Sequence, residues 1–526
     1  MKSINHRMKY FVHALFVLFP FILTAQVKSV ESLEVKYLNW HNLDIKTDNV
    51  TGTSVNRTWA ELLNNRKAKK TIIVAVIDSG FDIDHDDLKE SIWINEGEIS
   101  NNQIDDDGNG FVDDIHGWNF IGNSKGENVN YENMEYTRIC KIGKTHPDYE
   151  RAKGAYDAEL EKRKREKENL LKFESVYVNA KATILKKTGI AANTLKDLDG
   201  ISNNAPTDVI EAKRFLASRY EHGFTDATLI ELKTRNNDYL NYYLNLNFDA
   251  RILIGDNPSL IDGVYGNADV EGPRANHGTG VAGIVAAIRG NGIGIDGIAQ
   301  SVKIMCLRST PNGDERDKDV AMAIRYAVDN GAKVINMSFG KDFSPEKNLV
   351  DDAVKYAEQK DVLIVHGSGN SGKNIDVYES YPSDRYLDKS EATNWINVGA
   401  CGQLPDETLP AVFSNFGKDH VDIFAPGVNI ISLDSSNTYS MHDGTSLSAP
   451  VVTGVAALIL SYHPELTAVQ VIDLLIQSST KMDKLKVLEP GFNGERKKVK
   501  LKDLSKSGGI LNAYEALKKA DELYPN

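Results

Sequence analysis

The chain has 526 residues, and its 74 Asp and Glu residues outnumber its 61 Lys and Arg residues, giving a formal charge of −13. This charge argues against a nucleic-acid-binding protein, which would carry a concentrated basic face. With 41% hydrophobic and 26% charged residues, the composition is that of a globular protein and excludes disordered, collagen-like and polytopic membrane chains.

Residues 1–25 have the layout of a secretory signal peptide, in which basic residues such as Lys2 and Lys9 precede an apolar run. The run is shorter than the ~20 apolar residues that span a bilayer, and Pro20 interrupts it. We therefore expect cleavage and export, to a periplasm or to the medium, with no transmembrane segment remaining. A lead-in segment, 26–66, follows.

Short, continuous apolar runs rich in β-branched residues recur along the rest of the chain and predict buried strands. They are residues 71–77, 302–307, 334–337, 362–365, 396–400 and 421–424. Helical patterns, such as 317–330 and 347–359, lie between several of these runs. This alternation predicts an α/β fold with a doubly wound, mainly parallel sheet flanked by helices. Such sheets bind ligands at the carboxyl ends of their strands, where Asp78 lies.

The segment 126–263 breaks this alternation because it is long, highly charged and free of short apolar strands. Helical patterns cover residues 150–174, 208–222 and 225–245. We interpret the segment as an inserted helical subdomain that divides the main domain into two parts, 67–125 and 264–526. Two roles stay open for it, a cap or exosite near the active site and an inert surface elaboration.

The three cysteines, Cys140, Cys306 and Cys401, are too few for a disulfide scaffold. Cys306 and Cys401 lie in apolar, strand-like contexts. We therefore expect both to be buried free thiols that behave as small hydrophobic residues.

Three segments place a reactive side chain among glycines at the boundary of a predicted element: VAVIDSG with Asp78, NHGTGVAG with His277, and GTSLSAP with Ser446. We expect a helix to begin at Val281, after His277, and another to open at Ala449 and Pro450, because proline is favourable in a first helical turn. Ser446 then lies near a helix N-terminus.

These residue types suit nucleophilic hydrolysis. A serine hydroxyl needs a base to remove its proton, an imidazole titrates near neutrality, and a carboxylate orients that imidazole. Asn370, in HGSGN after a predicted strand, offers a side-chain amide that can stabilise an oxyanion together with the backbone N–H of Ser446.

The segments VAVIDSG, NHGTGVAG, HGSGN and GTSLSAP resemble the four signature segments of the subtilisin-like serine peptidases, which share the Asp, His, Ser order. The similarity continues through INMSFG, YPSD and FSNFG to GGILNAYEAL, and it covers about 71–120 and 266–517. It implies that Asp78, His277 and Ser446 form a catalytic triad, that Asn370 belongs to the oxyanion hole, and that catalysis needs no cofactor. The insertion makes the separation of Asp78 from His277 unusually long for this family.

The same resemblance implies a substrate-binding region. Ser338, Phe339 and Gly340 match the strand that pairs with an extended substrate backbone. Gly367, Ser368 and Gly369 precede Asn370, and Ser380 lies near the floor of the pocket for the side chain before the scissile bond. This small floor favours large apolar or uncharged side chains, whereas the adjacent Glu379 favours a basic one; both interpretations stay open.

Residues 105–114 form an acidic loop with oxygen-bearing side chains at alternate positions and glycine at the sixth, as a calcium loop requires. Asp105, Asp107, Asn109 and Asp113 are the candidate ligands of a structural calcium ion, and many subtilisin-like peptidases bind calcium in acidic loops. The twelfth position is His116, where an EF-hand has glutamate, so the match is incomplete. The alternative is an acidic surface turn stabilised by Asx hydrogen bonds.

Together these patterns predict an exported serine endopeptidase that acts on peptide or protein substrates through an acyl-enzyme. A peptide-binding or adhesion protein without turnover, and an esterase or transpeptidase using the same acyl-enzyme, are the alternatives. The sequence does not indicate an oligomeric state.

Overall fold

The computed structural model describes residues 28–257, 264–492 and 494–525. The predicted signal peptide, residues 1–25, lies outside the described residues. By their contacts, Glu174–Leu232 form a small compact unit, and the other described residues form a large one.

The large unit is built on a nine-stranded sheet with the order β10-β13-β7-β6-β5-β4-β1-β3-β2. Its strands are β1 (Ile72–Asp78), β2 (Gly117–Asn119), β3 (Val302–Arg308), β4 (Val334–Met337), β5 (Leu363–Gly367), β6 (Trp395–Cys401), β7 (Ile423–Pro426), β10 (Thr480–Lys481) and β13 (Gly509–Ile510). Every neighbouring pair is parallel except β10 with β13. The predicted mainly parallel sheet is confirmed.

The apolar runs form strands because both faces of the sheet are covered. In β1, Val74 and Val76 belong to one hydrophobic core, whereas Ala75 and Ile77 belong to the other. Successive side chains of a strand point to opposite faces, so a strand covered on both sides must be apolar throughout. This explains why no alternation of polar residues marks these strands in the sequence.

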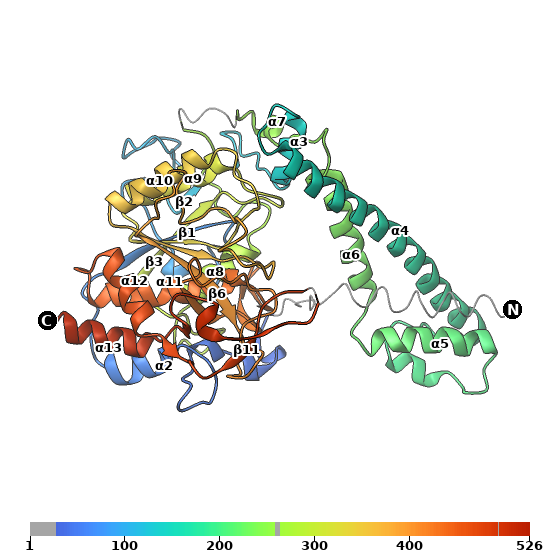
Figure 1. Ribbon diagram of the computed structural model, residues 1–526. Helices are drawn as coiled ribbons and strands as arrows, with labels where there is room; N and C mark the ends of the chain where they lie inside the picture. Colours follow the sequence, from blue (N-terminus) through green and yellow to red (C-terminus); the bar gives the residue numbers. More distant parts are fainter. Residues whose placement is uncertain (1–27, 258–263, 493, 526) are drawn as a thin grey trace. The chain divides into compact units, whose positions relative to one another are not determined.

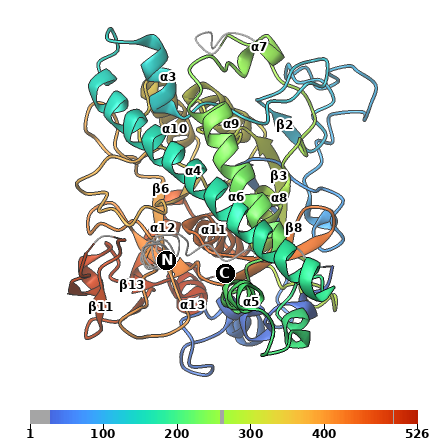
Figure 2. The same cartoon turned by 90° about the vertical axis from the view of Figure 1, so that its right-hand side faces the viewer.

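Helices cover both faces of the sheet, as Figures 1 and 2 show. The first core includes residues of α8 (Asn276–Ala286), α11 (Thr445–Tyr462), α12 (Ala468–Gln477) and α13 (Ala513–Leu523). The second includes residues of α9 (Asp317–Asp329) and α10 (Lys347–Gln359), close to their predicted bounds. Among the described residues, α11 alone is long and apolar enough to cross a membrane, and 94% of it is buried inside the protein.

The lead-in segment packs into the first core. Its short helices are η1 (Val30–Ser32), η2 (Val35–Tyr37), η3 (Trp40–Asn42), α2 (Val55–Arg57) and η4 (Thr58–Leu62). Trp40 is fully buried, and its indole N–H donates to the backbone oxygen of Asn429 at 3.1 Å. Outside the large sheet, β8 (Ile430–Asp434) pairs with β9 (Thr438–His442), and β11 (Lys486–Leu488) with β12 (Lys498–Lys500).

Helices occupy much of the segment 126–263. It contains α3 (Glu135–Ile142), α4 (Tyr149–Thr188), η6 (Lys196–Gly200), α5 (Thr207–Tyr220), α6 (Asp226–Asp238), η7 (Tyr239–Tyr243) and α7 (Arg251–Ile254). Helix α4 continues past the predicted end at residue 174, because Tyr177, Ala180 and Ile184 are buried at intervals of three and four residues. The contacts divide the segment: 174–232 form the small unit, and its two ends belong to the large unit.

The described chain contains three free cysteines. Cys306 and Cys401 are fully buried, as predicted, and burial raises the pKa of both thiols above the usual range. They are packing residues in the core.

Candidate active site

Asp78 and His277 are in direct contact at the carboxyl end of the sheet. Asp78 is the last residue of β1, is 1% exposed, and accepts a hydrogen bond from the backbone N–H of Ser79 at 2.7 Å. The Nδ1 atom of His277 lies 2.7 Å from Asp78 Oδ1. A proton on Nδ1 makes this contact a hydrogen bond, and the opposite ring nitrogen, Nε2, is then the one that can act as a base.

Helix α8 carries His277 and begins earlier than predicted, at Asn276 rather than Val281. Glycine disfavours helix formation, which is why the sequence pattern places the start after the glycines. Tertiary packing reverses that preference, because a Cβ atom at Gly278 would lie 2.3 Å from the backbone oxygen of Gly80. The glycine lets α8 approach the loop after β1, so that His277 reaches Asp78.

Ser446 is the second residue of α11, which begins at Thr445. The prediction that Pro450 opens this helix is wrong, because Pro450 lies inside it. Proline has no N–H to donate to the carbonyl four residues earlier, which is that of Ser446. This carbonyl accepts the hydroxyl of Ser338 instead, at 2.9 Å. Because Pro450 leaves this carbonyl without a helical donor, the carbonyl can accept the Ser338 hydroxyl, and this hydrogen bond links Ser446 to the segment after β4.

Asn370 lies in the loop after β5, and its orientation is fixed by Thr445. Its Oδ1 atom accepts hydrogen bonds from the backbone N–H and the hydroxyl of Thr445, at 2.9 and 3.0 Å. The amide nitrogen Nδ2 is left as a donor. An ideal Cβ atom on Gly444 would lie 2.8 Å from Ser446 Oγ and 3.6 Å from Asn370 Nδ2, so both atoms border the same small space.

A cavity of about 370 Å³ joins these groups, with His277, Asn370 and Ser446 on its wall. Six other predicted site residues also line it: Ser338, Phe339, Gly340, Gly367, Gly369 and Ser380. Ser368 does not line the cavity, because its hydroxyl is buried and donates to the backbone oxygen of Asn415 at 3.1 Å. Asp78 lies behind His277, outside the cavity wall.

His366, which the sequence analysis did not single out, supports the predicted substrate strand. Its Nε2 atom lies 2.9 Å from the backbone oxygen of Phe339, and its Nδ1 atom lies 2.9 Å from Asn397 Oδ1. Burial lowers the pKa of His366 below its ordinary value. Its place in HGSGN was visible in the sequence, but nothing there indicated that its ring lies against Phe339.

The start of the insertion also borders the cavity, through Met134 and Tyr136. Asp314 and Lys341 line the cavity as well. These residues come from segments far apart in the chain and carry no motif, so the sequence offered no signal for them. Glu379 is absent from the cavity wall and accepts the hydroxyl of Tyr381 at 2.8 Å.

The acidic loop brings together only part of the predicted calcium site. Carboxylate oxygens of Asp105, Asp107 and Glu98 lie within 4.8 Å of one another. Glu98, outside the loop pattern, was missed. Asp113 instead accepts the backbone N–H groups of Asn102 and Gln103, at 3.1 and 2.9 Å.

The remaining predicted ligand, Asn109, makes local hydrogen bonds. Its backbone N–H donates to Asp107 Oδ1 at 2.9 Å, and its Oδ1 atom accepts the backbone N–H of Phe111 at 2.7 Å. These are the Asx hydrogen bonds of the alternative interpretation.

Comparison with known proteins gives consistent matches. The profile of the subtilase family matches residues 69–494. A thermophilic serine proteinase from Bacillus sp. (strain AK1) is 36% identical over 42% of this chain and 49% of its own length. Subtilisin Savinase from Lederbergia lenta is 35% identical over 39% of this chain and 71% of its own. A solved protease of Pseudoalteromonas arctica PAMC 21717 is 26% identical, covering 49% of this chain and 80% of that one, with a TM-score of 0.39. The chain thus spans about half the length of the Bacillus relative.

Proposed function

Because the chain belongs to the subtilase family, we propose that it is a serine endopeptidase that hydrolyses peptide bonds through an acyl-enzyme. The observation that carries the proposal is the cavity lined by His277, Asn370 and Ser446. Asp78 lies behind the imidazole, with its Oδ1 atom 2.7 Å from His277 Nδ1. These are the four groups that acyl transfer from a peptide requires.

In the proposed mechanism, Ser446 Oγ attacks the carbonyl carbon while His277 Nε2 takes the hydroxyl proton. Asp78 holds the Nδ1–H tautomer and stabilises the imidazolium that forms. His277 then gives the proton to the leaving amine, and the acyl-enzyme remains. A water molecule, deprotonated by the same imidazole, releases the acid and restores Ser446.

The oxyanion of each tetrahedral intermediate is proposed to bind between Asn370 Nδ2 and the backbone N–H of Ser446. Thr445 donates two hydrogen bonds to the side-chain oxygen of Asn370, so the amide nitrogen of Asn370 remains available as a donor. The N–H of Ser446 lies in the first turn of α11, where backbone donors have no partner inside the helix. Because these donors are already in position, little free energy is needed to reorganise them when the negative charge develops on the oxygen.

The substrate backbone is proposed to pair with Ser338–Gly340. The backbone N–H and C=O groups of Gly340 have no hydrogen-bond partner among the described residues, so they are available to an extended peptide. Ser380 borders the cavity whereas Glu379 does not, which favours a large uncharged side chain before the scissile bond over a basic one.

The test compares hydrolysis of casein and of matched peptide and ester substrates by the wild type and Ser446→Ala. We expect peptide cleavage at internal bonds, lowered on the order of 10⁴-fold or more by the substitution. Ser175→Ala, at an exposed position of α4, is the control and retains full activity. Ester cleavage without peptide cleavage would favour the esterase alternative, and peptide binding without any turnover would favour the binding protein.

We also propose a structural calcium ion at Glu98, Asp105 and Asp107. Three converging carboxylates, with oxygens within 4.8 Å of one another, suit this hard cation. A chelator should lower the thermal midpoint of the wild type, since a ligand at 100 times its Kd stabilises by about 2.7 kcal/mol. The variant Asp105→Asn should be insensitive. An equal thermal midpoint of the wild type with and without chelator would contradict the calcium site and support the alternative, a turn stabilised by Asx hydrogen bonds.

Export is proposed from the pattern of residues 1–25. Expression of the full chain in bacterial cells should yield protein outside the cytoplasm, with an N-terminus near residue 26 by mass spectrometry. An intact Met1 on the cytoplasmic protein would contradict export.

A further inference from the structure

The insertion contributes part of the wall of the active-site cavity. Its backbone pairs with the segment after β3: the N–H of Asn312 donates to Asn130 O at 2.8 Å, and the N–H of Glu132 donates to Asn312 O at 2.7 Å. Met134 and Tyr136 follow directly and line the cavity. An extended substrate that continues past Gly340 therefore meets the insertion.

Asp314 lies where the insertion borders the cavity. A Cβ atom at Gly313 would lie 2.1 Å from the backbone oxygen of Glu132, so glycine allows the insertion to contact the segment after β3. The backbone N–H of Glu135 donates to Asp314 Oδ2 at 2.7 Å, and Arg138 donates to the Asp314 carbonyl at 2.9 Å.

The other carboxylate oxygen of Asp314, Oδ1, has no hydrogen-bond partner among the described residues. The side chain is only 7% exposed, yet it lines the cavity. Buried polar atoms usually have a hydrogen-bond partner. The free oxygen of this carboxylate, at the wall of a cavity, can therefore accept a hydrogen bond from a bound ligand.

Carboxyl groups outnumber the cations beside this part of the cavity wall. Carboxylates surround the position, and two cations lie among them: Glu135, Asp314, Glu315 and Asp317 against Arg138 and Lys341. Both cations are already engaged, because Arg138 pairs with Glu135 and Lys341 contacts Glu135 at 2.7 Å and Asp317 at 2.8 Å.

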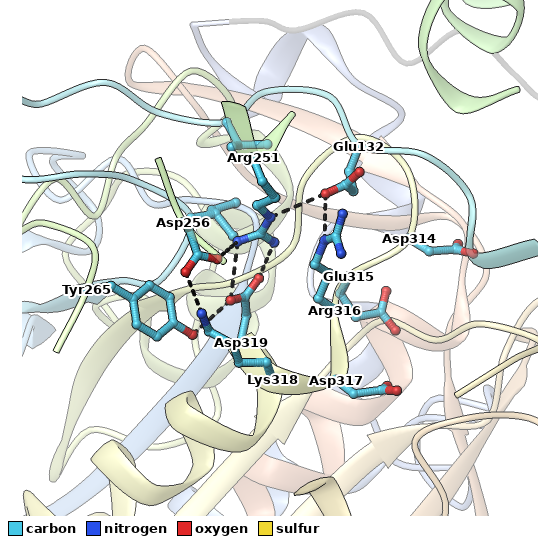
Figure 3. Close-up of polar contacts among 12 residues, drawn as sticks. Glu132, Arg251, Asp256, Tyr265, Asp314, Glu315, Arg316, Asp317, Lys318 and Asp319 are labelled. Carbon is cyan, nitrogen blue, oxygen red and sulfur yellow. Dashed lines mark hydrogen bonds and ion pairs between the residues drawn. The ribbon is translucent and has the colours of Figure 1, made fainter. Parts of the chain in front are cut away.

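Two further observations show that the cations compensate these carboxyl groups incompletely. Burial raises the pKa of Asp314 and of Glu315 above the ordinary range, and Glu315 Oε1 is buried without a hydrogen-bond partner among the described residues. The nearby guanidinium of Arg316 points away toward Glu132, as Figure 3 shows, with Nε 2.9 Å from Glu132 Oε2.

We propose that Asp314 receives a cationic group of the substrate, N-terminal to the scissile bond, where the insertion borders the cavity. The group is a Lys or Arg side chain or the free α-ammonium of a short peptide, which share the same chemistry. The inference rests on the proposed peptidase function and adds to it the substrate class that the insertion and Asp314 together select.

The experiment measures kcat/KM for a set of fluorogenic peptides. Each carries lysine or the uncharged norleucine at one position N-terminal to the scissile bond, other than the residue directly before it, and each is made with a free and an acetylated N-terminus. We expect the charged form to be preferred by about tenfold or more, the usual worth of a hydrogen bond to a charged group. A preference that follows the lysine identifies a side chain, and one that acetylation removes identifies the α-ammonium.

Asp314→Asn should bring the charged-to-neutral ratio close to one, while its amide oxygen still accepts the Glu135 N–H. Asp352→Asn, which removes one exposed charge from α10, is the control and should leave the ratio unchanged. The absence of any preference in the wild type, or a preference that persists in Asp314→Asn, would overturn the proposal.

Binding separates this inference from the peptidase proposal. Calorimetry with Ser446→Ala should show the same ratio between lysine and norleucine peptides without any turnover. A protein that binds with this ratio but never cleaves would refute the proposed function and retain the cation subsite. Cleavage by the wild type, with equal binding of the lysine and norleucine peptides, would support the proposed function and refute the cation subsite.

Discussion

Glu132→Gln is expected to destabilise the protein strongly at neutral pH and weakly in acid. Glu132 is fully buried where the insertion meets the main domain. Figure 3 shows it between Arg251 and Arg316, whose Nε atoms lie 3.4 and 2.9 Å from Glu132 Oε2. Burial alone raises the pKa of this carboxyl, but Arg138, Arg316 and Arg251 outweigh burial and lower the pKa to about 2.

The magnitude follows from this pKa. The carboxyl of Glu132 has a pKa of 4.5 in the unfolded chain and about 2 in the folded protein. At pH 7 the difference stabilises the folded state by about 3 kcal/mol. The contribution is fully present above pH 4.5 and is lost as pH falls toward 2, which leaves about 1 kcal/mol at pH 3.

The assay is urea unfolding followed by tryptophan fluorescence, in a Ser446→Ala background that prevents self-digestion. The difference in unfolding free energy between the Glu132→Gln variant and its parent should fall by about half or more between pH 7 and pH 3. Glu161→Gln, at an exposed position of α4, should stay within about 0.5 kcal/mol of its parent at both pH values. A Glu132→Gln effect that is independent of pH, or below about 1 kcal/mol at pH 7, would refute the reasoning.

Three further predictions concern other residues. Asn370→Ala should lower kcat by about 10²–10³-fold with a smaller change in KM, and a loss below tenfold in steady-state kinetics would exclude it from the oxyanion hole. His41 is fully buried, neither ring nitrogen has a partner among the described residues, and burial lowers its pKa to about 3. Below pH 6.5 the unfolded chain binds the extra proton, so stability falls with falling pH, and His41→Leu should gain about 2 kcal/mol relative to wild type between pH 7 and 5 in urea titrations. Gly278→Ala should cost about 1–3 kcal/mol and displace His277, lowering both the thermal midpoint and kcat/KM. Gly154→Ala, with open space around it, should do neither, and equal effects of the two would refute the packing argument.

The sheet could be predicted because its strands are buried on both faces. Each apolar run became a strand, and Asp78 stands at the carboxyl end of β1 as expected. The strand order could not be predicted, because the runs are equally apolar and carry no feature that selects neighbours. The start of α8 was misplaced for a related reason: the contact of Gly278 with the loop after β1 is tertiary, and it outweighs the low helix propensity of glycine.

The candidate site was predictable where glycine-rich segments mark it and not where single side chains arrive from elsewhere. His277, Asn370 and Ser446 come from such segments and share one cavity. Asp314 and Tyr136 lie in segments without a motif, and the pairing of the insertion with the segment after β3 brings them to that cavity. Long-range contacts of this kind leave no periodic pattern in a single sequence.

The central claim, that Ser446 is the nucleophile of a serine peptidase, is tested most directly by mass spectrometry of the purified protein after fluorophosphonate treatment. The expected result is one adduct on Ser446 and none on Ser446→Ala. An adduct on another residue, labelling that persists in Ser446→Ala, or no adduct on folded wild-type protein would contradict it.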